Sequence, residues 1–277
     1  MLSDVASTRI GMLLLLSGSL VTLPCATQPC QGQDASAPQL NLVLDGTLAA
    51  LGIGTFVTGT IISAAVTPPE RQDIAGLADA EIPTFDRMLM FSYSEQLNWL
   101  SPGFQFTSAL LPIAMAGYAW GQTGFEGTKT LVGTAILYFE SLSIALGMKD
   151  IVKSLTRRFR PYAYQPGLSD DLVLDADTVK SFPSGHTTAA FTGAAFTISM
   201  LLLYQQDSVL KLPLSVAALA VATTTAVLRV VSGQHFATDV LAGAAIGSAA
   251  GIIVPLLHRS RLAVSRPAAR WAGQQSP

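Results

Sequence analysis

One short segment of the chain combines residue types that favour anion binding. Residues 180–191 read KSFPSGHTTAAF and precede a long run of small and apolar residues. Pro183 restricts the backbone, Ser184 is a favoured helix N-cap, and Gly185 lets the backbone approach a ligand closely. A helix starting here would present free N–H groups and a positive dipole end beside His186. We therefore predict an anion site, although a lone boundary histidine is more often structural.

A second group of candidates is basic and lies in the sequence KDIVKSLTRRFRPY, residues 149–162. Lys153 and Arg160 are seven residues apart, or two helical turns, and would share one helix face. Arg157 would partly share that face, and Pro161 is expected to end the helix. The alternative is a set of basic anchors at a membrane edge.

The third group lies in LRVVSGQHFATDVLAG, residues 228–243. Arg229 closes one apolar run, and His235 and Asp239 open the next. Their i, i+4 spacing places the imidazole and the carboxylate on one helix face. Asp239 could then accept a hydrogen bond from one ring nitrogen and leave the other as a nucleophile. An ordinary capping pair is the alternative interpretation of these two residues.

The elements that must position these residues are apolar. Half of the 277 residues are hydrophobic, only 12% are charged, and mean hydropathy is +0.45. Soluble domains have about twice that charged fraction, roughly a quarter. The formal net charge of −2 offers no broad basic surface, so we do not expect nucleic acid as a partner.

The predicted fold is all-α, a bundle of six transmembrane helices. Each apolar run approaches the ~20 residues that cross a bilayer. The runs are 45–66, 102–121, 130–151, 186–206, 212–231 and 236–257. The connections 152–185 and 232–235 are two spans apart, so both lie on one membrane face. The three groups of candidates therefore meet there, as in a phosphate site.

The chain divides into four predicted parts. A short apolar run, 11–23, indicates a signal peptide or signal anchor, and Cys25 and Cys30 are interpreted as incidental. The parts are a signal or anchor segment at 1–26, a polar linker at 27–44, the transmembrane domain at 45–257 and a basic tail at 258–277.

These residues resemble the three motifs of the type 2 phosphatidic acid phosphatase (PAP2) superfamily, and the resemblance covers about residues 45–257. The matching positions are Lys153, Arg160 and Pro161, then Pro183, Ser184, Gly185 and His186, then Arg229, His235 and Asp239. One position departs from the motif, because Leu228 replaces the usual serine before the third-motif arginine.

The resemblance implies a membrane-bound lipid phosphatase that forms a phosphohistidine. His235 would attack phosphorus while Asp239 orients it, and His186 would act as general acid and then general base. The phosphate oxygens would be held by Lys153, Arg160, Ser184, Gly185 and Arg229. No cofactor and no metal are implied, and we see no carboxylate cluster that would hold a metal.

The substrate is expected to be a lipid phosphate or diphosphate within a membrane of other lipids. The candidates are phosphatidic acid, phosphatidylglycerol phosphate, undecaprenyl diphosphate and lipid A. The motifs do not choose among them, and the sequence does not indicate an oligomeric state. The loop 162–182, which is acidic, could act as a lid or select the substrate.

Three other functions remain open at this point. A secreted class A acid phosphatase or a vanadate-dependent haloperoxidase would share the motifs but would be soluble. A small transporter could also use intramembrane charges, but it would not need a histidine–aspartate pair opposite a helix N-terminus.

Some features outside the motifs also lead to expectations. The glycines at 243, 247 and 251 form a stripe suited to helix packing. Glu140 lies within an apolar run, where we favour a structural polar partner over a place along the substrate path. Segment 67–101 should form a connecting loop with one or two short amphipathic helices.

The predicted orientation rests on the basic tail. Arg259, Arg261, Arg266 and Arg270 indicate that this end is cytoplasmic. The catalytic face would then point to the periplasm from a bacterial inner membrane. A cleaved signal would conflict with six spans, because it would place residue 45 outside.

Overall fold

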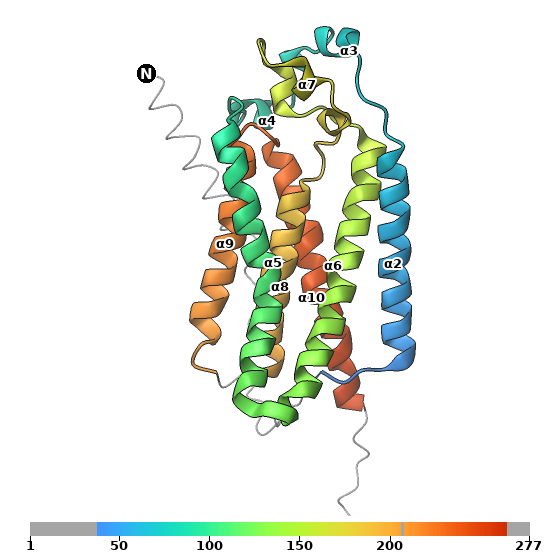
Figure 1. Ribbon diagram of the computed structural model, residues 1–277, viewed down its shortest axis with the longest axis vertical. Helices are drawn as coiled ribbons and strands as arrows, with labels where there is room; N and C mark the ends of the chain where they lie inside the picture. Colours follow the sequence, from blue (N-terminus) through green and yellow to red (C-terminus); the bar gives the residue numbers. More distant parts are fainter. Residues whose placement is uncertain (1–37, 206–207, 265–277) are drawn as a thin grey trace, which may run out of the picture.

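A computed structural model describes residues 38–205 and 208–264, and every regular element in these ranges is a helix (Figure 1). The all-α prediction is therefore confirmed. The signal or anchor segment at 1–26 and most of the basic tail lie outside the described residues, so these expectations remain predictions.

Six long helices run side by side and form the bundle (Figure 1). Their bounds are α2 Leu42–Ala64, α5 Glu95–Thr123, α6 Thr128–Thr156, α8 Gly185–Tyr204, α9 Lys211–Val231 and α10 Ala237–Val264. Each contains most of one predicted apolar run. The ends differ by a few residues for most helices, and α5 begins seven residues earlier than expected.

Five of these helices are long and apolar enough to cross a membrane, and the chain is an integral membrane protein. The exception within the described residues is α5, which contains two prolines, Pro102 and Pro112, and several polar residues. The count of six spans therefore stays a prediction.

Short helices cover one end of the bundle (Figure 1). Between α2 and α5 the chain forms α3 Arg71–Ala75, η1 Asp79–Glu81 and α4 Thr84–Met88. Between α6 and α8 it forms η3 Pro161–Tyr164, α7 Asp170–Val173 and η4 Ala176–Val179. The 3-10 helix η2, Gly124–Gly127, joins α5 to α6 at the other end. The prediction of short helices within 67–101 is confirmed.

The close packing of α8 against α10 depends on glycine. A Cβ atom added to Gly243, Gly247 or Gly251 would lie 2.6, 2.3 or 2.7 Å from a carbonyl oxygen of α8 or its N-cap. Such distances are too short for any side chain, so the predicted packing stripe is confirmed. This contact places the starts of α8 and α10, with their candidate residues, next to each other.

The predicted end of α6 is wrong. The helix stops at Thr156, and Arg157 follows in the left-handed conformation with φ 44°. The next residues pair with the returning loop, where the Ser181 amide donates to the Arg158 carbonyl at 3.0 Å. Arg160 therefore lies outside the helix and does not share a helical face with Lys153. Pro161 disfavours helical backbone at the preceding residue, which explains part of this difference.

Candidate active site

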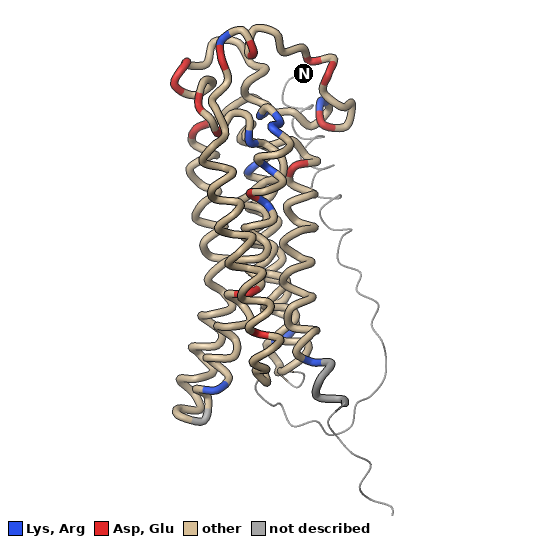
Figure 2. The backbone as a smooth tube through the Cα atoms, turned by 90° about the vertical axis from the view of Figure 1, so that its right-hand side faces the viewer, with Lys and Arg blue, Asp and Glu red and all other residues tan. Residues whose placement is uncertain are grey.

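A cleft of about 370 Å³ opens at the capped end of the bundle. Basic residues gather just below the loops of this end (Figure 2). The lining comes from the start of α5, the loop after α6, the start of α8 and the end of α9. The lining residues are Tyr93, Asn98, Trp99, Pro102, Arg160, Tyr162, Asp171, Leu172, Asp175, Asp177, His186, Arg229 and Gln234.

Arg160 is the most highly connected basic residue of the cleft. Its guanidinium donates through Nη1 to Gln234 Oε1 at 2.6 Å, and Nη1 also lies 3.4 Å from His235 Nε2. Nε donates to the Asp177 carbonyl at 2.9 Å, and Nη2 forms an ion pair with the Asp177 carboxylate. The side chain is almost completely buried, so these contacts fix its orientation.

Arg229, in the last turn of α9, lies on the other side of Gln234. Its Nη2 donates to Gln234 Oε1 at 3.1 Å, and Nη1 donates to Asn98 Oδ1 at 2.6 Å. Its backbone carbonyl accepts the amides of Gln234 and His235. One amide oxygen therefore holds two guanidinium groups together, although they carry like charges. Within the described residues, Arg229 Nε has no hydrogen-bond partner.

His235 lies beneath the cleft and is 2% exposed. Arginine can only donate, so the contact with Arg160 makes Nε2 the acceptor nitrogen and assigns the ring hydrogen to Nδ1. Burial, followed by the positive charges of Arg160 and Arg229, lowers the pKa of His235 well below its usual range. The ring is therefore neutral at neutral pH, with an unprotonated nitrogen next to an arginine.

The expected hydrogen bond from His235 to Asp239 is not formed. Nδ1 lies 3.6 Å from Asp239 Oδ2, in the direction expected but beyond hydrogen-bond length. The carboxylate instead accepts hydrogen bonds from the Phe236 amide at 2.9 Å, the Ser181 hydroxyl, and Arg158 at 2.6 Å. These three donors fix the carboxylate, so it can orient the imidazole only through a longer electrostatic contact.

Two residues that the sequence did not single out hold Asp239 in place. Arg158 lies between two buried carboxylates, with Nη2 at 2.7 Å from Asp86 and Nη1 at 2.6 Å from Asp239. Asp86, from α4, also accepts the amide and hydroxyl of Thr238 at 2.9 and 2.6 Å. The Arg158 guanidinium lies 4.3 Å from the ring centre of Phe236. The run of basic residues before Pro161 could have drawn attention to Arg158, whereas nothing in the sequence pointed to Asp86.

The start of α8 brings His186 to the cleft surface, as predicted. Ser184 is the N-cap residue, but its side chain makes no capping hydrogen bond. Instead its hydroxyl lies 3.0 Å from Thr187 Oγ1, and its amide donates to the Asp239 carbonyl at 2.9 Å. Ser184 thus links the starts of α8 and α10 and is fully buried.

The other predicted phosphate ligands lie nearby but do not line the cleft. Lys153 is buried, and its positive charge contributes to the lowered pKa of His235. Gly185 lies close to the Lys149 side chain, because a Cβ added to it would be 3.3 Å from Lys149 Cδ. Of the predicted residues, the cleft surface therefore includes Arg160, His186 and Arg229.

The acidic loop 162–182 forms one wall of the cleft through Asp171, Asp175 and Asp177. Burial raises the pKa of the Asp177 carboxyl, but the positive charges of Arg160 and Lys153 outweigh this effect, so the pKa lies below its usual range. Asp177 is therefore ionised at neutral pH and occupies two donors of Arg160.

Glu140 lies away from this cleft, so the alternative that it lines the substrate path gains no support. Its carboxylate oxygens have no hydrogen-bond partner within the described residues, yet they lie near Asp45 and His258. The structure thus brings together two carboxylates and a histidine, a group that the sequence analysis did not foresee. The three residues come from different helices, which the sequence could not reveal.

Comparison with known families gives a match in the second half of the chain. The sequence profile of the PAP2 superfamily matches residues 134–262. This part of the chain belongs to the PAP2 superfamily. The matched range contains the PAP2 motif residues from Lys153 to Asp239, and it extends from α6 to the end of α10.

Two curated relatives match over roughly half of the chain. A lipid A 1-phosphatase from Porphyromonas gingivalis is 33% identical over 147 residues, which are 52% of this chain and 28% of that protein. A PA-phosphatase related-family protein from Dictyostelium discoideum is 29% identical over 135 residues, 46% of this chain and 49% of that protein. The chain thus matches less than half of the length of either relative.

Among solved structures, a transmembrane PAP2 type phosphatidylglycerolphosphate phosphatase from Bacillus subtilis is 22% identical to this chain. The alignment covers 79% of this chain and 99% of the other, with a TM-score of 0.45.

Proposed function

We propose that this protein is a lipid phosphatase that removes phosphate from a lipid phosphate or diphosphate in the membrane. The observation that carries the proposal is the meeting of two arginines and one histidine at a cleft at the end of an apolar bundle, with a second, buried histidine next to one of the arginines. Arg160 and Arg229 share Gln234, His186 faces the cleft, and His235 Nε2 lies next to Arg160. Such a group suits a phosphate more than an uncharged ligand.

In the first proposed step, His235 Nε2 attacks phosphorus. An N–P bond forms while the P–O bond to the lipid breaks, and His186 supplies a proton to the leaving oxygen. The neutral imidazole implied by the lowered pKa of His235 is the nucleophilic form. The free Nε of Arg229 and the donors of Arg160 would stabilise the charge on the equatorial oxygens.

In the second proposed step, water breaks the phosphohistidine. His186 takes a proton from the water, whose oxygen bonds to phosphorus as the N–P bond breaks. Inorganic phosphate then leaves. Lys153, Ser184 and Gly185 are assigned supporting roles, because they lie around the histidines without lining the cleft.

The cleft position suits an amphiphilic substrate. Its headgroup would enter the polar cleft while its tails stay beside the exposed apolar helix surfaces. Trp99 and Pro102, at the start of α5, lie on the cleft wall, and Trp99 is largely exposed. We propose that the protein lies in a bacterial inner membrane with this end in the periplasm, which is consistent with the four arginines between residues 259 and 270 at the other end.

Purified protein in detergent tests the function directly. We expect phosphate release from at least one of phosphatidic acid, phosphatidylglycerol phosphate, undecaprenyl diphosphate and lipid A. His235→Ala should abolish release, His186→Ala should lower it by roughly 10²–10⁴-fold, and Glu95→Gln, on the exposed first turn of α5, should leave it unchanged.

A labelled substrate provides the second readout. Radioactive phosphate should be trapped on the wild-type protein as an acid-labile, base-stable adduct and should not be trapped on His235→Ala. EDTA should leave phosphate release intact. Turnover by His235→Ala, or activity lost with EDTA and restored by Mg²⁺, would contradict the mechanism.

A further inference from the structure

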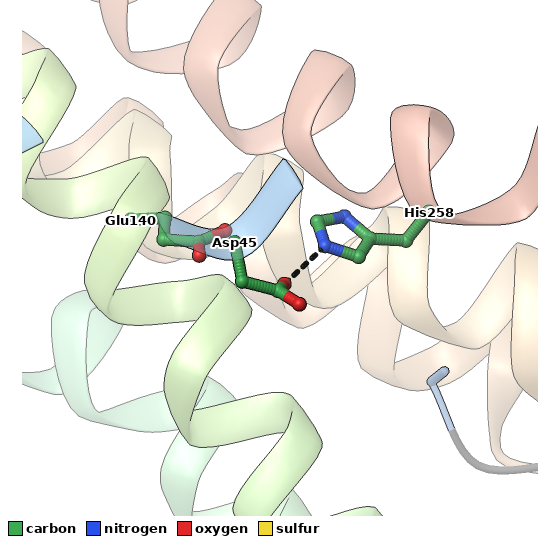
Figure 3. Close-up of side chains that lie close together, drawn as sticks. All are labelled: Asp45, Glu140 and His258. Carbon is green, nitrogen blue, oxygen red and sulfur yellow. Dashed lines mark hydrogen bonds and ion pairs between the residues drawn. The ribbon is translucent and has the colours of Figure 1, made fainter. Parts of the chain in front are cut away.

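A second polar cluster lies within the apolar bundle, separate from the cleft. Asp45 comes from the first turn of α2, Glu140 from the middle of α6, and His258 from the last part of α10. Figure 3 shows the three side chains converging, and one ligand atom of each lies within 4.8 Å of the others. The α2 start and the α10 end lie at the end of the bundle opposite the short helices (Figure 1), and the cleft opens beside those short helices.

Glu140 is the residue that requires an explanation. It is 0% exposed, and both of its carboxylate oxygens lack a hydrogen-bond partner within the described residues. A buried carboxylate without a donor or a counter-charge is strongly destabilising. Its oxygens point toward Asp45 and His258 (Figure 3), so a cation located between these groups would satisfy them.

The hydrogen bonds of His258 indicate where such a cation would lie. Nδ1 is 2.8 Å from the Val254 carbonyl, which can only accept, so Nδ1 carries a hydrogen. Nε2 is 2.7 Å from Asp45 Oδ1. In the neutral ring with its hydrogen on Nδ1, the lone pair of Nε2 faces a lone pair of Asp45 Oδ1, and these two groups repel each other. Metal-ligating histidines commonly donate one ring N–H to a backbone carbonyl, as Nδ1 does here, and ligate through the other nitrogen, which here is Nε2 beside Asp45.

The charges of the cluster favour a divalent ion. Two carboxylates and a neutral imidazole carry a total charge of −2, so one divalent cation makes the site neutral, whereas one proton would leave a buried negative charge. Nitrogen and carboxylate oxygen are both common ligands of Zn²⁺, at about 2.0–2.2 Å. The Asp45 side chain is 15% exposed, so the cluster reaches the surface of the bundle.

We propose that Asp45, Glu140 and His258 form a binding site for one divalent transition-metal ion such as Zn²⁺, which ties α2, α6 and α10 together. The Asn41 amide, which donates to the second oxygen of Asp45, holds that carboxylate in place. This site is structural and independent of the proposed phosphatase chemistry, which takes place at the other end of the bundle.

Zinc content of the purified protein is the first test. Full-length protein without an affinity tag is stripped with a chelator, dialysed against buffered Zn²⁺ and measured by elemental analysis. We expect about one Zn²⁺ per chain, and a loss of affinity of more than about tenfold in Glu140→Gln and Asp45→Asn. Mn²⁺ and Mg²⁺ are measured in parallel, and Mg²⁺ should bind more weakly because one ligand is an imidazole.

Two control variants locate the ion. Glu95→Gln removes a carboxylate from an exposed helix end and should keep the Zn²⁺. His235→Ala removes the proposed nucleophile and should also keep it. Loss of Zn²⁺ in His235→Ala, or equal Zn²⁺ in Glu140→Gln and wild type, would overturn the assignment. Because zinc content is independent of turnover, a negative result here leaves the phosphatase proposal standing.

Thermal unfolding in detergent at pH 8 gives a second readout that does not depend on counting metal. With chelator, Glu140→Gln should melt at or above the wild-type temperature, because a neutral amide costs less to bury than an unpaired carboxylate. With Zn²⁺, the wild type should melt above Glu140→Gln, because the ion binds only the folded state. A wild type that Zn²⁺ does not stabilise, and that contains no Zn²⁺, would show that protons alone neutralise the cluster.

Discussion

In the cleft without substrate, the Arg160 guanidinium contacts both a carboxylate, that of Asp177, and a neutral amide oxygen, that of Gln234. Asp177 occupies Nε and Nη2 through its carbonyl and carboxylate, while Gln234 occupies Nη1. A phosphate entering the cleft would compete with the carboxylate, which is 56% exposed and free to move away. Gln234, 5% exposed, would remain and keep Arg160 close to Arg229.

We therefore predict that Asp177→Asn strengthens the binding of anions at the cleft. Removing the negative charge of Asp177 leaves Arg160 free to bind phosphate. The expected gain in anion affinity is limited to the strength of the partly exposed Arg160–Asp177 ion pair. Competitive inhibition by orthophosphate or vanadate should tighten by up to about fivefold, because such pairs contribute at most about 1 kcal/mol.

The matched control for this change is Asp171→Asn. It removes the same charge from the same cleft wall, whereas the ion pair with Arg160 belongs to Asp177 and stays intact. It should shift inhibition less than Asp177→Asn does. An equal shift in both variants would mean that general electrostatics, and not release of Arg160, controls anion binding.

At the scale of elements, three segments are joined around Asp239. The short helix α4 supplies Asp86, the irregular segment after α6 supplies Arg158, and the start of α10 supplies Thr238 and Asp239. The chain must form all three contacts to place the third-motif loop. The glycine contacts between α8 and α10 then set the position of His186 relative to that loop.

We predict that Gly247→Ala destabilises the protein by about 1–3 kcal/mol, the usual cost of overpacking. The added Cβ would lie 2.3 Å from the Thr188 carbonyl, so α8 and α10 would have to separate. Gly54→Ala is the matched control, because the space around Gly54 on α2 is open.

Thermal unfolding in detergent measures both variants. Gly54→Ala should melt within a few degrees of the wild type, and Gly247→Ala should melt clearly lower and lose phosphatase activity at lower temperature. A Gly247→Ala protein as stable as Gly54→Ala would mean that the two helices are not held at this distance.

At the scale of the whole molecule, the two ends of the bundle differ. One end carries the cap and the acidic loop, and the other carries the start of α2 and the end of α10 (Figures 1 and 2). The cleft opens at the capped end. An integral membrane protein with this arrangement exposes its two ends to different compartments.

We predict that the capped end faces the periplasm. The test places a single cysteine at the exposed Ala80, between α3 and α4, or at the exposed Val209, between α8 and α9, after Cys25→Ser and Cys30→Ser. A membrane-impermeant maleimide should label Ala80→Cys in intact cells and Val209→Cys only after lysis. The opposite pattern would reverse the proposed orientation.

The positions of the long helices could be predicted from sequence because each depends on local composition. A run of about 20 apolar residues has few alternatives to a helix in a membrane, whatever its neighbours are. The motif residues were identified for the same reason, since their types and spacing are local. His186, Arg160 and Arg229 reach the cleft as expected. The end of α6 was missed because the segment from Arg157 to Arg160 pairs with a loop some twenty residues later.

What the sequence by itself determined is the class of fold, the apolar helices and most of the candidate residues at the cleft. Only the tertiary structure decided the partners of those residues. Gln234 joins two arginines, Asp86 reaches Asp239 through Arg158, and His258 meets Asp45, which is 213 residues away. The physical reason is that an apolar segment forms a helix from its own backbone hydrogen bonds, whereas a buried charge is satisfied by whichever distant group packing brings to it.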